Sequence, residues 1–152
     1  MRSLIKTALH LIEHGNRDLK GRAEKWLGWL DMEKCLQAAM MADTSDQAMQ
    51  FTRILGTEGT DPASMTNEAN VFLQVVQSLF EAEPPACLRV FGYTSVMLKM
   101  LRRPVVWQMG DTMYSLGAND GVPRAMVDRC VGRMKACATF AKGGCFGRVP
   151  RL

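Results

Sequence analysis

The chain has 152 residues, of which 47% are hydrophobic and 22% are charged, and its formal net charge is +4. This length and balance are those of a globular domain with its own core, and they exclude a disordered or collagen-like chain. No uninterrupted apolar run approaches the ~18 residues that a membrane-spanning helix needs. We therefore expect a globular domain or subunit without a transmembrane segment.

The apolar residues are mostly of the types that favour helices. Alanine, leucine and methionine together number 42, against 14 for valine and isoleucine. Unbranched side chains lose little rotamer freedom in a helix, whereas β-branched side chains lose more. The composition therefore predicts an all-α protein.

The first half of the chain contains helical patterns separated by clear breaks. Apolar residues at helical spacing predict a first helix that stops at Gly15, a second that begins near Asp18, and a kink or a new cap at Asp31. The hydroxyl and polar residues at 44–47 predict the cap of a further helix. Residues 56–62, with two glycines and a proline, predict a loop.

The second half continues with three longer helical patterns. An amphipathic helix is expected from Ser64 to the proline pair at 84–85, followed by a mostly apolar helix over 88–101. Pro104 is expected to open another helix, and Pro123 to stand in the first turn of the last one. The helix predicted after Pro104 carries Trp107, Met109, Met113, Tyr114 and Leu116.

These patterns predict an all-α fold, an irregular bundle of about six to seven helices. Residues 1–142 are expected to form a single helical domain, and residues 143–152 a basic C-terminal tail that contains glycine. Spacings of roughly 40 residues between helix pairs also fall in the range of helical-repeat arrays. Repeat-like helix pairs are therefore the alternative arrangement.

Positive and negative charge are separated along the chain. Residues 1–84 carry a formal charge of −4 and residues 85–152 a charge of +8. A basic C-terminal half favours contact with an anionic surface, whether protein, RNA or lipid. The candidate contact residues are the cations near the C-terminus and one aromatic residue among them: Arg124, Arg129, Arg133, Lys135, Lys142, Phe146, Arg148 and Arg151.

Methionine is abundant, at 12 residues. Its flexible thioether adapts to irregular surfaces, so Met-rich helix faces favour a docking role. Trp26 and Trp29 lie three positions apart around Leu27-Gly28 and are expected to point in different directions, one buried and the other exposed. We take Trp29 as the candidate interface anchor.

Both histidines of the chain lie in residues 10–14, HLIEH, at positions i and i+4 of one helix. The string resembles the H-x-x-E-H signature of inverted zincin peptidases. That resemblance implies that His10 and His14 bind zinc, that Glu13 is the general base, and that Glu81 or Glu83 is the third ligand. A zinc-dependent hydrolase is therefore one alternative, whereas an ordinary helix surface that binds no metal is the interpretation we prefer.

Other catalytic motifs are missing from the sequence, which contains no phosphate-binding loop and no G-x-S-x-G elbow. The five cysteines form no C-x-x-C pair, and this usage fits a reducing compartment, either the cytoplasm or an organelle such as the mitochondrion. We expect a non-enzymatic subunit of a larger intracellular protein assembly, without a cofactor, that docks through Met- and Trp-rich helix faces and the basic C-terminal helix and tail. An RNA-contacting helical protein of a ribonucleoprotein is the other alternative.

Overall fold

The computed structural model describes residues 1–56, 61–89 and 91–145, with side chains as far as residue 139. The predicted all-α class is confirmed, because the chain is 73% helical and the described part contains seven helices and one small two-stranded sheet. None of the helices in these ranges is both long and apolar enough to cross a bilayer. The elements are α1 (Arg2–His14), α2 (Arg17–Trp29), α3 (Met32–Leu55), α4 (Pro62–Glu81), α5 (Ala86–Arg89), α6 (Tyr93–Met100), β1 (Val105–Met109), β2 (Thr112–Leu116) and α7 (Arg124–Cys145).

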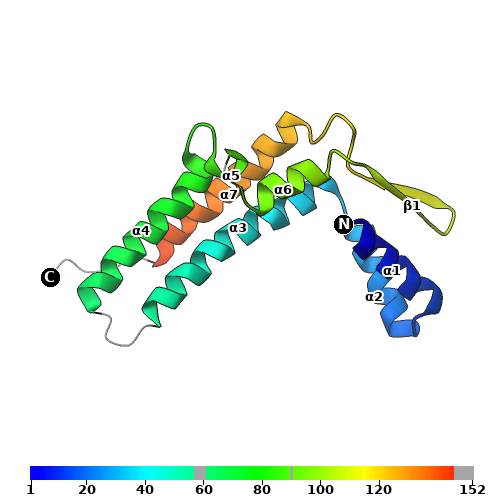
Figure 1. Ribbon diagram of the computed structural model, residues 1–152, viewed down its shortest axis with the longest axis horizontal. Helices are drawn as coiled ribbons and strands as arrows, with labels where there is room; N and C mark the ends of the chain where they lie inside the picture. Colours follow the sequence, from blue (N-terminus) through cyan, green and yellow to red (C-terminus); the bar gives the residue numbers. More distant parts are fainter. Residues whose placement is uncertain (57–60, 90, 146–152) are drawn as a thin grey trace.

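The molecule is a bent arch (Figure 1). The long helices α3, α4 and α7 lie side by side in one arm, and α5 and α6 lie near the top of the arch. The α1–α2 pair and the β-hairpin form the other arm. Helix lengths range from 4 to 24 residues, so the described helices form an irregular bundle rather than an array of equal helix pairs.

The breaks predicted in the first fifty residues at Gly15 and Asp31 are confirmed. Helix α1 ends at His14, and Gly15 is its C-cap. Asn16 Oδ1 accepts a hydrogen bond of 3.0 Å from the backbone N–H of Leu19, which caps α2. Asp31 is the N-cap of α3, because its Oδ1 accepts a bond of 2.7 Å from the N–H of Lys34. Side chains with short polar oxygens satisfy the free N–H groups of a helix start, which explains why these ends are readable from sequence.

The new helix start predicted at residues 44–47 is wrong. Helix α3 runs without interruption from Met32 to Leu55. The Thr44 hydroxyl does not cap a helix but donates to the Met40 carbonyl, at 3.1 Å, within the same helix. A threonine in a helix interior is readily satisfied in this way, so a polar cluster alone does not end a helix.

The helix predicted after Pro104 is also wrong. Residues 105–109 and 112–116 form an antiparallel hairpin in which Trp107 is opposite Tyr114. Gly110, with φ of +59°, occupies the first position of the two-residue loop, where a type II′ turn favours glycine. The buried Trp107 ring stacks on Tyr114, with centroids 5.8 Å apart. The two residues therefore pack as a cross-strand pair and not along the helix predicted after Pro104.

The other helix boundaries shift less. The single helix predicted over 88–101 is divided into α5 and α6, because Gly92 is extended and starts α6. Helix α4 begins at Pro62, two residues before the predicted start. The last helix begins at Arg124, so Pro123 directly precedes its first turn rather than standing within it, and the helix extends to Cys145, beyond the expected end at residue 142.

Two hydrophobic clusters form the core, and α3 contributes to both. Cys35 belongs to the cluster that joins α1, α2 and the hairpin, including Ile5, Leu27 and Trp107. Its neighbour Leu36 belongs to the cluster that joins α3, α4, α5 and α7. Adjacent residues of a helix point in directions about 100° apart, so one helix can serve two clusters. Helix α3 therefore connects the two arms of the arch.

We predict that replacing Asp31 with alanine lowers the free energy of unfolding by about 1 kcal/mol at neutral pH, because the cap of α3 is lost. Burial by itself raises the pKa of the Asp31 carboxyl, but the hydrogen bond from the Lys34 N–H and the nearby Lys34 ammonium outweigh it, so this pKa lies below 3.8. The carboxylate therefore stabilises the fold above the unfolded pKa, and this contribution is lost as the pH falls through the folded pKa.

Urea unfolding from neutral to strongly acid pH measures this effect. The Asp31→Asn variant is the control, since its amide still accepts a bond but does not titrate. We expect the advantage of the unmodified chain over Asp31→Asn to shrink with acid, and a difference that stays constant with pH would contradict the assignment.

Candidate functional site

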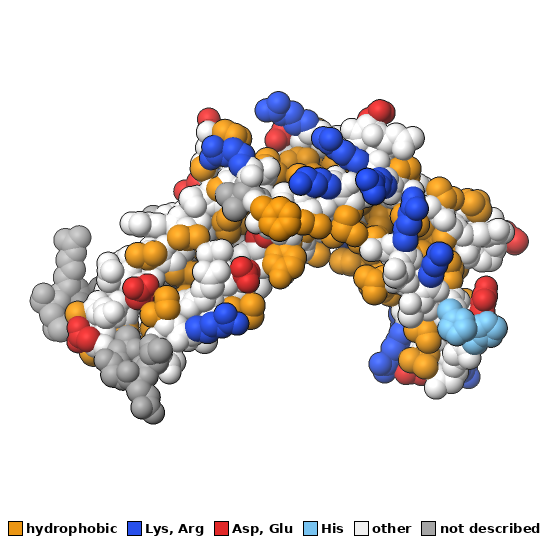
Figure 2. Space-filling model, viewed as in Figure 1, with side chains coloured by type: hydrophobic (Ala, Val, Ile, Leu, Met, Phe, Trp, Pro, Cys, Tyr) orange, Lys and Arg blue, Asp and Glu red, His pale blue; other side chains and the backbone are white. Residues whose placement is uncertain are grey.

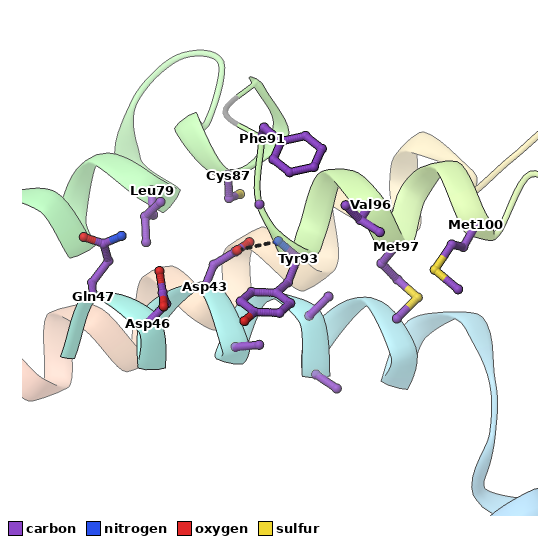
Figure 3. A pocket seen from close by; sticks show the side chains of 14 residues that line it. Asp43, Asp46, Gln47, Leu79, Cys87, Phe91, Tyr93, Val96, Met97 and Met100 are labelled. Carbon is purple, nitrogen blue, oxygen red and sulfur yellow. Dashed lines mark hydrogen bonds between the residues drawn. The ribbon is translucent and has the colours of Figure 1, made fainter. Parts of the chain in front are cut away.

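A carboxylate from α3 caps the start of α6. Asp43 Oδ1 accepts a hydrogen bond of 2.7 Å from the N–H of Tyr93 (Figure 3). Oδ2 of the same carboxylate accepts one of 3.0 Å from the N–H of Thr94. Asp43 is buried, and Thr94 is fully buried. A buried carboxylate is tolerated where charge-assisted hydrogen bonds and the positive end of a helix dipole compensate its lost hydration.

Gly92 makes room for this cap. A Cβ atom at Gly92 would lie 2.5 Å from Asp43 Oδ1, so a larger residue there would displace the carboxylate from its two donors. The Ser95 hydroxyl accepts from the Gly92 N–H at 3.1 Å and so satisfies the next free donor of the helix start. The sequence Gly92-Tyr93-Thr94-Ser95 is thus arranged around a side chain from fifty residues earlier.

A groove of about 710 Å³ runs beside this cap, between α3 and α6. Its floor on α3 is made of Ala38, Ala39 and Ala42, and its walls are made of larger apolar side chains. Figure 3 shows these walls around the cap, and Figure 2 shows hydrophobic side chains gathered near the middle of the arch, where α6 lies over α3. The larger apolar residues that line the groove are Leu79, Cys87, Phe91, Tyr93, Val96, Met97 and Met100.

Several groove residues are exposed although they are large and apolar. Phe91 is 82% exposed, and Tyr93, Val96 and Met100 are also exposed. Isolated apolar residues on a surface are common, but a contiguous set along one groove is typical of an interaction site.

The polar groups of the groove have limited chemistry. The Asp43 carboxylate is already bound to two backbone donors, which leaves Asp46 and Gln47 at one end. Burial, together with the nearby negative charge of Asp43, raises the pKa of the Cys87 thiol to about 11. Cys87 is therefore a neutral thiol at physiological pH and behaves as an apolar lining residue rather than a nucleophile.

The basic residues predicted on the last helix divide into two groups. Arg129 and Arg133 both bind Glu33 of α3, at 3.2 Å and 2.6 Å between nitrogen and oxygen. Because Glu33 lies on α3 and both arginines lie on α7, the pairing joins these two helices. Glu33 is more buried than either arginine. Part of the positive charge that predicts an anionic partner is therefore used inside the fold.

The remaining cations predicted on the last helix, Arg124, Lys135 and Lys142, also lie on α7. Arg124 and Lys135 line a second cavity, of about 880 Å³, together with three carboxylates from Glu83, Asp120 and Asp128. Lys142 lies on α7, but its side chain is outside the described atoms, and Phe146, Arg148 and Arg151 lie outside the described residues.

The predicted exposure of one tryptophan of the Trp26 and Trp29 pair is confirmed. Trp29 is 47% exposed at the end of α2, whereas Trp26 is half-buried rather than buried as predicted. The Lys34 ammonium lies 5.4 Å from the centroid of the Trp29 ring, so a cation contacts part of its surface.

The two histidines are close together, as the motif predicts. The rings of His10 and His14 have centroids 4.6 Å apart on the exposed side of α1. Among the residues that the structure describes, Glu81 and Glu83 included, no three His, Cys, Asp or Glu side chains are grouped to hold a metal ion. The third ligand implied by the H-x-x-E-H resemblance is therefore not brought to the pair.

The sequence predicts no site at this groove. Phe91, Val96 and Met97 fall in the mostly apolar helix predicted over 88–101, and Asp43 carries no predicted role. The sequence signal for the cap is weak: Gly92 starts a helix without a side chain of its own to cap it, so the acceptor has to come from elsewhere.

Comparison of the chain with protein-family models, with curated proteins and with solved structures gives no match.

We predict that Asp43→Ala lowers the free energy of unfolding by about 2–3 kcal/mol, because the N–H groups of Tyr93 and Thr94 lose a charged acceptor in a buried position. Asp46→Ala is the matched control on the same helix and should change stability by less than about 0.5 kcal/mol. Gly92→Ala should also destabilise, since its methyl group displaces the carboxylate. Urea unfolding of the three variants measures this, and equal losses in the two aspartate variants would contradict the capping role.

Thiol labelling tests the environment of the cysteines. Burial raises the pKa of Cys35, Cys87 and Cys130, whereas Cys137 is exposed. We expect iodoacetamide to modify Cys137 in the folded chain and the three buried thiols only after unfolding. Peptide mass spectrometry reads the modified positions, and labelling of Cys87 as fast as Cys137 would contradict the described groove.

Proposed function

We propose that this chain is a non-catalytic subunit of a larger protein assembly and that it binds a partner through the α3–α6 groove. The observation that carries the proposal is the exposure of large apolar side chains, Phe91 and Tyr93 above all, along a groove of about 710 Å³. Burying such surface against a partner is favourable, by ~25 cal/mol per Å² of apolar area.

The occupant that fits the groove is an amphipathic helix of the partner. The residues of α3 that line the groove run from Ala38 to Gln47, a length of roughly 14 Å, which matches two to three turns of a second helix. Alanine side chains on the floor let a helix backbone approach closely, and the walls supply surface for its apolar anchors. The Asp46 carboxylate at one end would face a Lys or Arg of that helix.

Binding rather than catalysis is the activity that these groups support. Acid–base or nucleophilic catalysis needs a positioned base and an activated nucleophile. In the groove the Asp43 carboxylate is held by backbone donors, and Cys87 is a neutral thiol. We therefore propose no enzymatic role for this site.

The compartment we propose is an intracellular, reducing one, the cytoplasm or an organelle such as the mitochondrion. The support is the state of the cysteines: Cys35, Cys87, Cys130 and Cys137 are all free thiols. Proteins of oxidising compartments commonly pair such residues in disulfides.

The experiment is site-specific photo-cross-linking in the cells that make the protein, with benzoylphenylalanine at Val96. We expect cross-links to one segment of a partner, in which apolar residues recur at helical spacing and a Lys or Arg stands at one end. Adding Met100→Glu should reduce the cross-linking roughly tenfold, because a charge would have to be buried in the interface.

The matched control is Met41→Glu, which changes an exposed methionine on α3 that does not line the groove. It should leave the cross-links unchanged, and both variants should keep the unfolding temperature of the parent chain. Cross-links only to a second copy of this chain, equal loss in both variants, or no cross-link from Val96 would each overturn the proposal.

A further inference from the structure

A second groove, of about 410 Å³, follows one edge of the β-hairpin. It is lined by residues 104–108, which include most of β1, and by Arg2, Ile5, Lys6 and Leu9, which share one face of α1. It touches consecutive residues of β1 and none of β2. The groove therefore runs along the edge of β1 that β2 does not cover.

The backbone of this edge is open. Hydrogen-bonded pairs alternate along an antiparallel ladder, so about half of the N–H and C=O groups of β1 point away from β2. Outside the hairpin, no backbone hydrogen bond links residues 105–109 to any other part of the chain that the structure describes. An open strand edge is a template for another strand.

The side chains beside the edge select the charge of that strand. Arg2 and Lys6 stand at i and i+4 on α1, and neither has an ion-pair partner among the described residues. Both also lie in the first turns of α1, where the helix dipole adds positive potential. Figure 2 shows Lys and Arg side chains following one another from α6 to α1 on the face in view.

A buried donor at the same groove also lacks a partner. Trp107 is only 4% exposed, yet its indole Nε1–H has no hydrogen-bond acceptor within the described ranges. Trp107 lines the groove. Buried indole donors are usually paired, so this one is an exception beside the groove.

We propose that this groove binds an extended acidic peptide segment of another protein, which adds a third strand to the free edge of β1. Its backbone pairs with the outward N–H and C=O groups of β1, and its Asp or Glu side chains contact Arg2 and Lys6. This site is independent of the α3–α6 groove and does not rest on the function proposed for it.

Fluorescence anisotropy with labelled synthetic peptides tests the proposal on the full chain. The probe is a short peptide of alternating valine and glutamate, and the comparison peptides replace glutamate by lysine or methylate alternate backbone nitrogens. We expect the acidic peptide to bind, binding to weaken as salt rises, and the other two peptides to bind at least about tenfold more weakly.

A charge-swapped variant with Arg2→Glu and Lys6→Glu should prefer the lysine peptide, and it should fold because acidic residues suit a helix N-terminus. The matched control is Arg17→Glu with Lys20→Glu, which makes the same change in the first turns of α2. The control should keep the preference of the parent chain.

Three results would overturn the proposal. The first is stronger acidic-peptide binding by the charge-swapped variant, which would mean that the cations protect the edge from pairing. The second is binding of a single-stranded oligouridine but of no peptide, and the third is self-association of the chain through the hairpin. The Met100→Glu variant should bind the acidic peptide normally, so this site and the α3–α6 groove can fail separately.

Discussion

The carboxylate of Asp43 fixes the position of α6 on α3, and the α3–α6 groove exists because of it. Two backbone N–H groups of α6 donate hydrogen bonds to this one side chain, and Gly92 provides the space that the carboxylate needs. A buried negative charge that lost these donors would be costly, so the carboxylate, the glycine and the helix start stabilise one another. The exposed side chains of α6 are held in one orientation as a result.

Acidic side chains at the start of α3 and along it stabilise the fold at three points. Asp31 caps the helix itself, Glu33 binds two arginines of α7, and Asp43 caps α6. Two of these three acidic residues contact elements from the second half of the chain. The separation of negative and positive charge along the sequence is therefore used partly for internal attraction, which leaves fewer cations of α7 for an outside partner than the sequence alone suggests.

The two grooves offer different chemistry, one near the middle of the arch and the other on the arm that contains α1 and the hairpin (Figure 1). The α3–α6 groove has an alanine floor and apolar walls, whereas the β1 groove has an open backbone edge beside Arg2 and Lys6. The first suits side-chain packing of a helix, and the second suits backbone pairing with a charged strand. Both are consistent with a chain that recognises other proteins.

The sequence determined the features that depend on near neighbours: the helical content, the ends at Gly15 and Asp31, and the exposure of one tryptophan of the pair Trp26 and Trp29. Caps and helical spacing act within about four residues, so they are visible in a linear chain. Only tertiary structure decided that residues 105–116 form a hairpin, because Trp107 is buried against both Tyr114 and the α1–α2 arm. The cap of α6 likewise depends on an acceptor fifty residues away, which no local pattern contains.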